Sequence, residues 1–598
     1  MSITQPFSMN LREVIHPFNY SGVQLKESQF KKQFDEMKEY YLNIKNENIL
    51  KGFRERAKIN APGEDLGGWY TGYSTFLRVH PEIKKPSNVF NAFGQWLGAL
   101  ARMYKVTNDQ RIINKLEYLL DEWGKTIDPD GFFYYGNNPN GPHYEYDKTV
   151  GGLVDVYEYA GVGDAIKYLK KITEWAKNDL NRRRVPPTPD NFTGGGYTGG
   201  FESDNEWYTL SENLYRAYLL TGDDFYKNFA EVWHYPTYWN DLASKQHCIT
   251  ALHAYSHVNT LSSAAMAYKV TGDRIYLDAI MNAYEIFKDT QLFATGGFGP
   301  WERMANQFGS LGNSLWLEER SFEAPCGSWA TFKLTKYLLS LTGKAHYGDW
   351  TEKILYNGIG ACLPMAENGK TFYYADYRIT GASKKYYMDT WPCCSGTYPL
   401  AVTDYHNIIY FYDKNSLYVN LFIPSQVDWT VNQSSVRVIQ DTDFPTDGNI
   451  HLKIQVSQPA EFTIKFRVPE WVQGNISVKI NGKEKSDTWK VGEWGQVVKT
   501  WNNGDTIDIQ LPMHLEFFPI DTRHPRVAAL CYGPVVLAAD QSGPLVGTIE
   551  NPSSWIQQIT KDELVFQVKN KVQTSIFKPF YSYQEGERYY LYNFIDKG

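Results

Sequence analysis

Apolar positions in the first two-thirds of the chain recur at helical spacing, in segments separated by a short turn that returns again and again. Its copies are VTNDQ (106–110), GVGDA (161–165), LTGDD (220–224), VTGDR (270–274) and LTGKA (341–345). Each copy follows one helix-like segment and precedes another, at intervals of roughly 50–70 residues, about one helical hairpin. With a further hairpin expected from residues 28–44, the pattern predicts a closed toroid of six helix pairs. An open solenoid is the alternative.

The turn residues fit this interpretation. A glycine in the left-handed conformation commonly ends a helix, and we expect this at Gly163, Gly222, Gly272 and Gly343. An aspartate after such a glycine can cap the next helix through its carboxylate, and we expect this at Asp164, Asp223 and Asp273.

Near residue 405 the pattern changes to period two. Segments such as HLKIQVSQ, EFTIKFRVPEWV and RVAALCYGPVVLAA alternate apolar with polar positions and are separated by Asn, Gly and Asp turns, which is typical of antiparallel strands. We therefore expect a mainly helical barrel domain at 1–404, a β-sandwich at 405–520, and a second small β domain or a continuation of the sandwich at 521–598.

Composition narrows the functional classes. The formal net charge of the 598-residue chain is −7 and its acids and bases are interspersed, which argues against a nucleic-acid or anionic-membrane partner. No apolar run of about 18 residues predicts a membrane span. The N-terminus has no charged segment followed by an apolar one, so we expect a cytoplasmic protein, or a secreted or periplasmic one if a signal has been removed.

The aromatic share is 16%, which is high. Flat rings stack on the apolar faces of sugars, so this composition modestly favours a carbohydrate ligand. The alternative is that the rings fill the core.

Six cysteines are too few for a disulfide scaffold in a chain of this length; they are Cys248, Cys326, Cys362, Cys393, Cys394 and Cys531. The adjacent pair Cys393 and Cys394 is poorly placed to form a bridge with itself. Cys326 begins a predicted helix, and Glu323 lies three residues earlier. Three thiols and a carboxylate supply the four ligands that zinc prefers. The alternative is three buried structural cysteines.

Catalytic groups in a helical toroid lie on the loops at one end. Four loops rich in Gly and aromatic residues are the candidates: 63–80, 193–212, 293–310 and 373–399. Glu302 lies in the third of these, where partial burial could raise its pKa and make it a proton donor. The alternative is a surface glutamate.

Several motifs resemble the β-L-arabinofuranosidase clan, glycoside hydrolase families 127 and 146. They are EAPCGSWATFKL, WPCCSGTYP, HVNT (257–260) and TGGFGPWER (295–303), and the resemblance extends over nearly the whole chain. It implies an (α/α)6 barrel with β-sandwich domains. It also implies a retaining glycosidase in which a zinc-bound cysteine is the nucleophile, here Cys393.

By the same resemblance, Cys326, Cys394 and a glutamate just before Cys326 complete the zinc site, and Glu302 is the acid/base. His257 corresponds to a substrate histidine. Tyr373 or Tyr374 corresponds to a tyrosine near the sugar.

The chain departs from the family pattern at the zinc site. The family places its ligand glutamate two residues before the cysteine, where this chain has Ala324. Glu323 is therefore one residue out of register, and Glu319 is a weaker candidate for the fourth ligand.

Two histidines of the family that face the sugar are also replaced. Asp147 stands before Lys148, and the next loop offers Trp207 and Tyr208. We therefore expect a substrate other than an ordinary β-L-arabinofuranoside. Further polar or aromatic candidates for sugar contact are Trp69, His80 and His253.

The leading hypothesis is a retaining exo-glycosidase that acts on an oligosaccharide or glycan, with a homodimer left open. The first alternative is an inverting hydrolase or polysaccharide lyase without zinc, whose carboxylates would come from Asp147, Glu202, Asp204 and Glu302. The second alternative is a non-catalytic carbohydrate-binding protein whose cysteines only brace the barrel.

Overall fold

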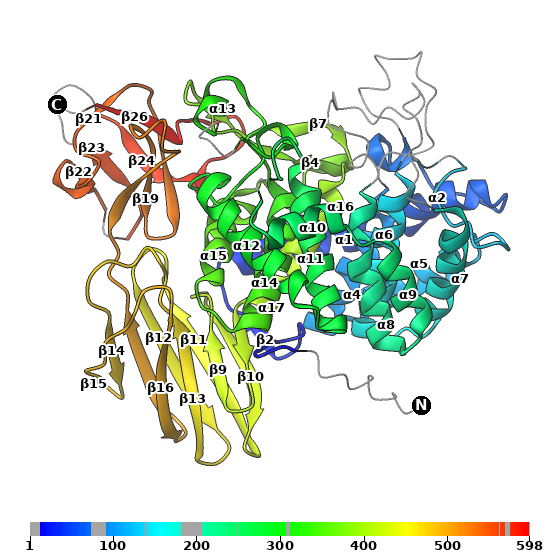
Figure 1. Ribbon diagram of the computed structural model, residues 1–598, viewed down its shortest axis with the longest axis horizontal. Coiled ribbons are helices and arrows are strands. Elements are labelled where there is room, and N and C mark those ends of the chain that lie inside the picture. The colour runs from blue at the N-terminus through cyan, green and yellow to red at the C-terminus, as the bar shows by residue number, and fades with distance from the viewer. Residues whose placement is uncertain are drawn as a thin grey trace.

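The computed structural model describes residues 12–72, 91–137, 139, 141–180, 206–246, 248–306, 311–560, 562–568 and 574–596. A helical body lies beside two β regions, the lower one formed mainly by strands of residues 410–510 and the upper one by strands near the C-terminus (Figure 1). The predicted order, helical region first and β region second, is confirmed.

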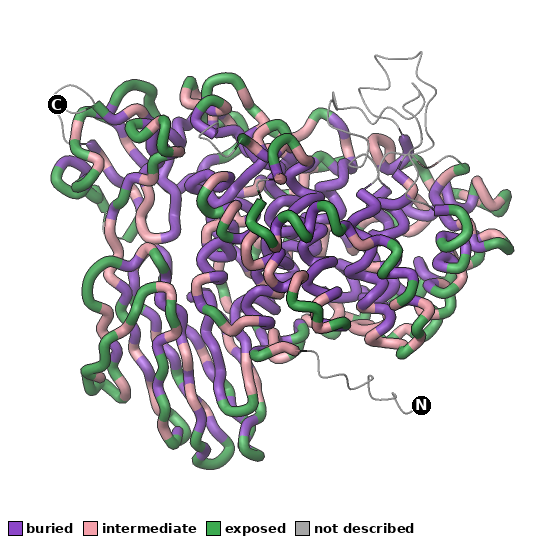
Figure 2. The backbone as a smooth tube through the Cα atoms, viewed as in Figure 1, coloured by how far each residue is buried: buried purple, intermediate pink, exposed green. Residues whose placement is uncertain are grey.

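Six inner helices form a closed ring in the described part of the chain. They are α4(Phe93–Thr107), α6(Pro142–Asp155), α8(Ser211–Thr221), α11(Ala254–Thr271), α14(Ala324–Thr342) and α16(Cys394–Thr403). Each packs against the next in this order, and α16 packs against α4, so the ring closes. Figure 2 shows that the backbone of this central region is largely buried.

Six outer helices back the inner ones. They are α1(Gln29–Asn43), α5(Gln110–Gly124), α7(Asp164–Asp179), α9(Asp224–Val232), α12(Arg274–Thr290) and α15(Tyr347–Asn357). The packed pairs are α4 with α5, α6 with α7, α8 with α9, α11 with α12, α14 with α15, and α16 with α1. The arrangement is the closed toroid of six helix pairs that the repeat predicts. Three further helices of the described residues, α2(Asn46–Arg56), α10(Pro236–Ala243) and α13(Leu311–Leu317), are not among these pairs.

Three of the turns follow the predicted chemistry. Gly222, Gly272 and Gly343 end their helices with φ of 70°, 77° and 67°. The carboxylates of Asp223 and Asp273 accept hydrogen bonds from backbone N–H groups in the first turns of α9 and α12. Together these caps satisfy backbone groups that a helix end leaves free.

The turn after α6 differs. A π-helical segment, η2(Val156–Ala160), extends α6, so the left-handed residue is Gly161, with φ of 73°. Gly163 has φ of −62° and Asp164 is already the first residue of α7. The predicted caps at Gly163 and Asp164 are therefore wrong, because the helix ends two residues earlier than the repeat suggests.

Two antiparallel-rich sheets pack face to face as a sandwich. One has the order β1(His16–Pro17), β8(Tyr410–Tyr412), β9(Ser416–Val419), β13(Ala460–Arg467), β16(Trp494–Trp501). The other has the order β15(Lys483–Glu484), β14(Ser477–Ile480), β17(Thr506–Gln510), β12(Asn449–Val456), β11(Ser434–Thr442), β10(Ser425–Val431), β2(Val23–Leu25). Trp429 and Phe462 meet across the interface with ring centroids 5.5 Å apart.

A third sheet lies beside the barrel. Its path is β21(Leu545–Val546), β26(Tyr592–Asp596), β19(Val527–Tyr532), β20(Val535–Ala539), β24(Ile576–Pro579), β23(Phe566–Val568), β22(Ile556–Gln558), and β18(Leu515–Pro519) pairs with β19. Asn357 of α15 donates to the carbonyl of Pro534 at 2.8 Å, and the hydroxyl of Tyr592 accepts from the backbone of Ala294 at 2.8 Å. The sheet thus supports the loop that precedes Glu302.

The domain boundaries at 404 and 520 stay predictions. In the part of the chain that the structure describes, no helix is long and apolar enough to cross a membrane.

Candidate active site and metal centre

Three cysteines and one glutamate meet at the end of the barrel where α14 and α16 begin. We call Glu323, Cys326, Cys393 and Cys394 the thiol centre; all four are buried, and one ligand atom of each lies within 4.8 Å of the others. Cys326 Sγ lies 3.8 Å from Cys393 Sγ and 3.3 Å from Cys394 Sγ. These separations are far longer than a disulfide bond, and all three cysteines are free.

Two helix starts deliver the thiols. Pro325 occupies the first turn of α14, a position where its missing N–H costs nothing, and Cys326 follows it. Cys393 is the N-cap of α16 and Cys394 its first residue. The positive ends of both helix dipoles therefore meet at the centre, which favours negative charge on the sulfurs.

A two-residue ladder delivers the glutamate. β3(Phe322–Glu323) pairs with β5(Tyr374–Ala375), and the backbone N–H of Ala324 donates to the carbonyl of Tyr373 at 2.8 Å. Glu323 is thus held in extended backbone just before α14, which lets its carboxylate reach the centre although it lies three residues before Cys326. Glu319 is engaged elsewhere, 3.4 Å from the guanidinium of Arg378.

The titration behaviour of the centre is uneven. Burial raises the pKa of Cys326, of Cys394 and of Glu323 well above their ordinary values. Burial alone would also raise the pKa of Cys393, but hydrogen bonds from Cys326, Cys394 and Tyr373 outweigh it and hold that pKa well below its ordinary value. Tyr373 Oη lies 3.2 Å from Cys393 Sγ. The one anionic group that the centre favours is therefore the Cys393 thiolate.

The donor set of the centre fits a thiophilic metal ion. Two thiolates bound at about 2.3 Å with tetrahedral angles lie about 3.8 Å apart, close to the Cys326–Cys393 separation. Glu323 Oε1 lies 3.5 Å from Cys393 Sγ and 3.8 Å from Cys394 Sγ. Its second oxygen, Oε2, is buried without a hydrogen-bond partner, as expected of a carboxylate whose partner is an ion.

Glu302 faces this region from a strained loop. Trp301 and Glu302 both have positive φ, 58° and 57°, a conformation that non-glycine residues rarely adopt and that concentrates at functional sites. The guanidinium of Arg320 lies over the Trp301 ring at 4.5 Å, and a bridge between His253 and Arg303 ties the loop to the start of α11. The loop is therefore braced on both sides of Glu302.

The carboxylate of Glu302 has defined partners. The hydroxyl of Tyr374 donates to Oε1, and His253 Nε2 lies 3.4 Å from Oε2. Burial raises the pKa of Glu302, but the contacts with His253, Tyr374 and Tyr373 outweigh it and lower that pKa below its ordinary value. Tyr373 is therefore the side chain that links Glu302 to Cys393.

Two family models match the chain over most of its length. The β-L-arabinofuranosidase catalytic domain of glycoside hydrolase family 127 covers residues 22–407, and the middle domain of the same family covers residues 416–513. The chain belongs to this family. The resemblance seen in the cysteine and GPWER motifs is thus confirmed.

One curated relative and two solved structures support the assignment. The non-reducing end β-L-arabinofuranosidase of Bifidobacterium longum subsp. longum is 25% identical over 352 residues, 54% of this chain and 50% of the relative. The match thus spans half the length of that relative. A family 127 β-arabinofuranosidase structure has a TM-score of 0.75 at 18% identity, covering 98% of this chain and 99% of its own. The Geobacillus stearothermophilus T6 family 127 β-L-arabinofuranosidase has a TM-score of 0.71 at 17% identity, covering 97% of this chain and 100% of its own. Both show the same fold.

An aromatic wall flanks the thiol centre of this family member. The rings of Tyr373 and Tyr374 lie 4.2 Å apart between centroids, and Tyr387 lies 4.7 Å from Tyr373. Trp69 stands edge-on to Tyr373 and donates to the Asp389 carboxylate at 3.1 Å. Tyr387 has no distinctive sequence signal, because a tyrosine in a Tyr-rich loop does not reveal which face its ring takes.

Two of the predicted sugar contacts, His257 and Asp147, are buried. His257 is fully buried among tyrosine rings, and its Nδ1 lies 2.9 Å from the His253 carbonyl; burial lowers its pKa to about 3. Asp147 accepts from Lys148 at 2.8 Å, from Thr209 at 3.1 Å and from Asn213 at 2.9 Å. Its two oxygens are therefore taken by the protein, which favours a role in placing Lys148 over direct contact with a sugar.

Of the remaining candidates from the sequence, one is described by the structure and three are not. Trp207 is buried with its ring edge-on to Tyr208 and Tyr235. His80, Glu202 and Asp204 lie outside the described residues.

The carboxylate of Glu206 is one that sequence reasoning missed. The residue is 8% exposed, has φ of 49°, and its Oε2 is buried without a partner. Burial raises its pKa to about 7; His253 and Lys148 oppose the rise, and Cys393 and Asp147 add to it. Its position in one of the four Gly- and aromatic-rich loops was the available signal, but that loop holds four carboxylates and the pattern does not rank them.

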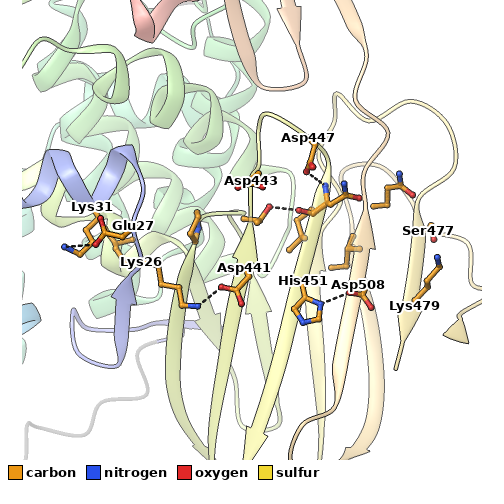
Figure 3. Close-up of a pocket in the computed structure, with 17 residues that line it drawn as sticks. Lys26, Glu27, Lys31, Asp441, Asp443, Asp447, His451, Ser477, Lys479 and Asp508 are labelled. Atoms are coloured by element: carbon orange, nitrogen blue, oxygen red, sulfur yellow. Dashed lines mark hydrogen bonds and ion pairs between the residues drawn. The ribbon is translucent and has the colours of Figure 1, made fainter. Parts of the chain in front are cut away.

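A hollow lies on the sandwich beside the start of α1, away from the thiol centre (Figure 3). It is acidic, but its charged groups are largely engaged: Lys26 with Asp441 at 2.5 Å, and His451 with Asp508 at 2.6 Å. Its lining residues include no Phe, Tyr or Trp, the rings on which sugars usually stack. The thiol centre and the Glu302 loop therefore remain the candidate active site.

Proposed function

We propose that the protein is a retaining exo-glycosidase that hydrolyses a terminal β-L-arabinofuranoside or a related sugar from a glycan. The observation that carries the proposal is the pairing of a stabilised thiolate at Cys393 with a separate carboxylate at Glu302, joined by Tyr373. Glycoside cleavage with retention needs one nucleophile and one proton donor, and these two groups have that chemistry.

The reaction proceeds in two displacements. Cys393 Sγ attacks the anomeric carbon, the bond to the leaving oxygen breaks, and Glu302 gives its proton to that oxygen. A water then attacks the same carbon, Glu302 takes its proton, and the carbon–sulfur bond breaks. Two inversions at one carbon restore the original configuration. Cys393 is the leaving group of the second displacement and returns to its thiolate form.

Zinc is the metal that we assign to the thiol centre, with Glu323, Cys326, Cys393 and Cys394 as the residues that would hold it. When bound, it keeps the thiols deprotonated at neutral pH. The residues themselves supply the rest: Tyr373 orients the Cys393 sulfur, and the two helix ends stabilise its charge.

Glu302 must carry a proton when the leaving group departs. In the structure without a bound sugar, however, the pKa of Glu302 is lowered. Binding of a sugar excludes water from the site and strengthens the burial effect, which raises the pKa of a carboxyl group. The aromatic wall of Trp69, Tyr373 and Tyr387 is the surface on which the apolar face of the sugar would lie.

A screen of p-nitrophenyl pentofuranosides and hexosides, each with both anomers, tests the proposal. We expect hydrolysis of a β-L-arabinofuranoside or a related terminal furanoside, with the first-formed product in the same anomeric form by NMR. Metal analysis should give about one zinc per chain. Inverted product, or full activity in a freshly reduced sample without metal, would overturn the mechanism.

A further inference from the structure

Glu206 has a buried carboxylate whose Oε2 has no hydrogen-bond partner among the described residues. It stands immediately before η4(Trp207–Thr209), at the start of the turn that leads into α8. Its backbone is held in a left-handed conformation, φ 49° and ψ 28°, by hydrogen bonds from Thr209 to the Glu206 carbonyl. A non-glycine residue kept in this conformation indicates that its side-chain direction matters.

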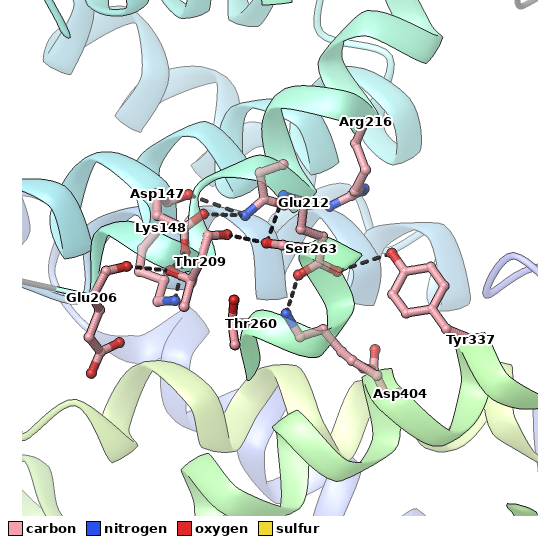
Figure 4. Close-up of polar contacts among 12 residues, drawn as sticks. Asp147, Lys148, Glu206, Thr209, Glu212, Arg216, Thr260, Ser263, Tyr337 and Asp404 are labelled. Carbon is pink, nitrogen blue, oxygen red and sulfur yellow. Dashed lines mark hydrogen bonds and ion pairs between the residues drawn. The ribbon is translucent and has the colours of Figure 1, made fainter. Parts of the chain in front are cut away.

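The charges around Glu206 place its carboxylate toward the catalytic region. It interacts electrostatically with Cys393, His253 and Lys148, and its charge is felt by Glu323 as well. Figure 4 shows its carboxylate pointing away from the ion pair of Asp147 and Lys148. Glu206 therefore lies within electrostatic range of both the thiol centre and His253.

Nearby cations are already engaged. Lys148 Nζ lies 2.8 Å from the Asp147 carboxylate and 4.8 Å from the centroid of the Tyr144 ring. His253 faces Glu302 through Nε2 and Ser256 through Nδ1. Among the described residues, Oε2 of Glu206 lacks the hydrogen bond that a buried carboxylate normally has.

We propose that Glu206 is a specificity-determining residue that accepts a hydrogen bond from a hydroxyl of a neutral sugar in the site. The inference rests on the proposed glycosidase function. A buried, unpartnered acceptor is costly, and a sugar hydroxyl is the donor that the proposed reaction brings to this place. Glu206, Glu302 and Glu323 surround the site with carboxyl groups, so an anionic sugar such as a uronate is disfavoured.

The test asks whether Glu206 and one substrate hydroxyl contribute to kcat/KM through the same hydrogen bond. kcat/KM is measured for Glu206→Ala and the wild type, using the best p-nitrophenyl glycoside of the screen and its monodeoxy analogues. In the wild type, loss of the recognised hydroxyl should lower kcat/KM by about 10- to 100-fold, the range for hydrogen bonds to charged groups. In Glu206→Ala the same deoxy analogue should be hydrolysed nearly as well as the parent glycoside.

Controls separate recognition from folding. Glu174→Ala, in the exposed face of α7, should keep the wild-type sensitivity to every deoxy analogue. Glu206→Gln retains an acceptor oxygen and should recover part of the coupling, whereas a purely structural role would lower kcat/KM equally for all analogues.

The outcomes keep the two proposals apart. An active wild type whose deoxy sensitivities are unchanged in Glu206→Ala overturns the role of Glu206 and leaves the glycosidase function intact. A wild type that hydrolyses none of the glycosides overturns the function itself. Faster hydrolysis of p-nitrophenyl uronides than of neutral sugars would overturn the assignment of a neutral substrate.

Discussion

The barrel buries two clusters of ionisable groups whose chemistry is opposite. The inner charge network lies between the inner helices; its members are Arg102, Asp155, Glu212, Arg216, Lys333 and Asp404 (Figure 4 draws several). There, acids alternate with bases: Arg102 lies 2.8 Å from Asp155 and 2.9 Å from Asp404. The thiol centre instead gathers four acidic groups, with no base among them.

This difference separates a structural cluster from a functional one. Burying a charge is tolerated when an opposite charge accompanies it, and the inner charge network meets that condition within the protein. Four acidic groups at one point are tolerated only if most stay protonated or a cation binds them. The pKa directions at the thiol centre follow from this constraint, with the negative charge collected on Cys393.

Removal of Cys393 should have the largest effect. Cys393→Ala deletes the nucleophile, so kcat/KM should fall by about 10⁴- to 10⁶-fold, the scale seen when a covalent nucleophile is lost. Metal content and activity are measured on the same samples. Cys362→Ala, which removes a thiol outside the centre, is the matched control and should stay active. Comparable activity in the two variants would place the chemistry elsewhere.

Breaking a pair in the inner charge network should act on stability instead. Lys333→Met leaves the buried Glu212 carboxylate without its cation, which typically costs about 3–5 kcal/mol of unfolding free energy. Urea unfolding measures this loss. Glu212 keeps a 3.1 Å contact with Tyr337, so the lower end of the range is expected.

Two further variants sharpen the stability comparison. Lys32→Met removes an exposed partner of Glu36 and should cost under about 1 kcal/mol. In the double variant Lys333→Met with Glu212→Gln, stability should partly return. A drop in kcat/KM of the folded Lys333→Met protein as large as that of Cys393→Ala would erase the distinction between the clusters.

The loss of activity on substitution of Glu302 should depend on the leaving group of the substrate. Glu302→Gln cannot donate a proton, so hydrolysis of a natural disaccharide should fall by about 10²- to 10⁴-fold. An aryl glycoside with a good leaving group needs little protonation and should lose far less in its glycosylation step, measured as the release of p-nitrophenol in the first turnover. Glu319→Gln, whose carboxylate pairs with Arg378 outside the centre, is the control. Equal losses on both substrates would indicate a structural role.

The sequence was sufficient for the toroid and for the three cysteines that meet at the thiol centre. The turn repeat encodes helix ends through local rules, so Gly222 and Asp223 could be assigned directly. Register across the chain is different: whether Glu323 reaches the cysteines depends on the ladder between β3 and β5, which no local spacing encodes. Asp147 likewise could not be assigned, because its partners Thr209 and Asn213 come from another helix pair.

The direction of side chains explains why the sequence did not reveal the roles of Glu206 and His253. Glu206 is marked by its left-handed backbone and by the charges around it, neither of which can be read from the sequence. His253 could be named as a polar candidate, but its two roles follow from the loop that packs on it. Side-chain direction is a tertiary property, and it decides which polar groups are left for a ligand.

Substitution of His253 should have the smallest effect on activity. It is also the most diagnostic, because His253 both caps helix α11 and contacts the proposed acid/base Glu302. Its Nδ1 accepts from the Ser256 backbone N–H as the N-cap of α11, so a neutral ring carries its proton on Nε2, which faces Glu302. His253→Asn preserves the cap, since asparagine is a preferred N-cap residue, but its shorter side chain does not reach Glu302.

The sign of the change follows from the direction of the Glu302 shift. His253 lowers the pKa of Glu302, so its loss raises that pKa, and the acid stays protonated to higher pH. The alkaline limb of the kcat/KM profile should therefore move upward, by about one pH unit or less for a single hydrogen bond, with little change in the free energy of unfolding. A limb that stays in place while stability falls would assign His253 to the helix cap alone and group it with the paired, structural charges.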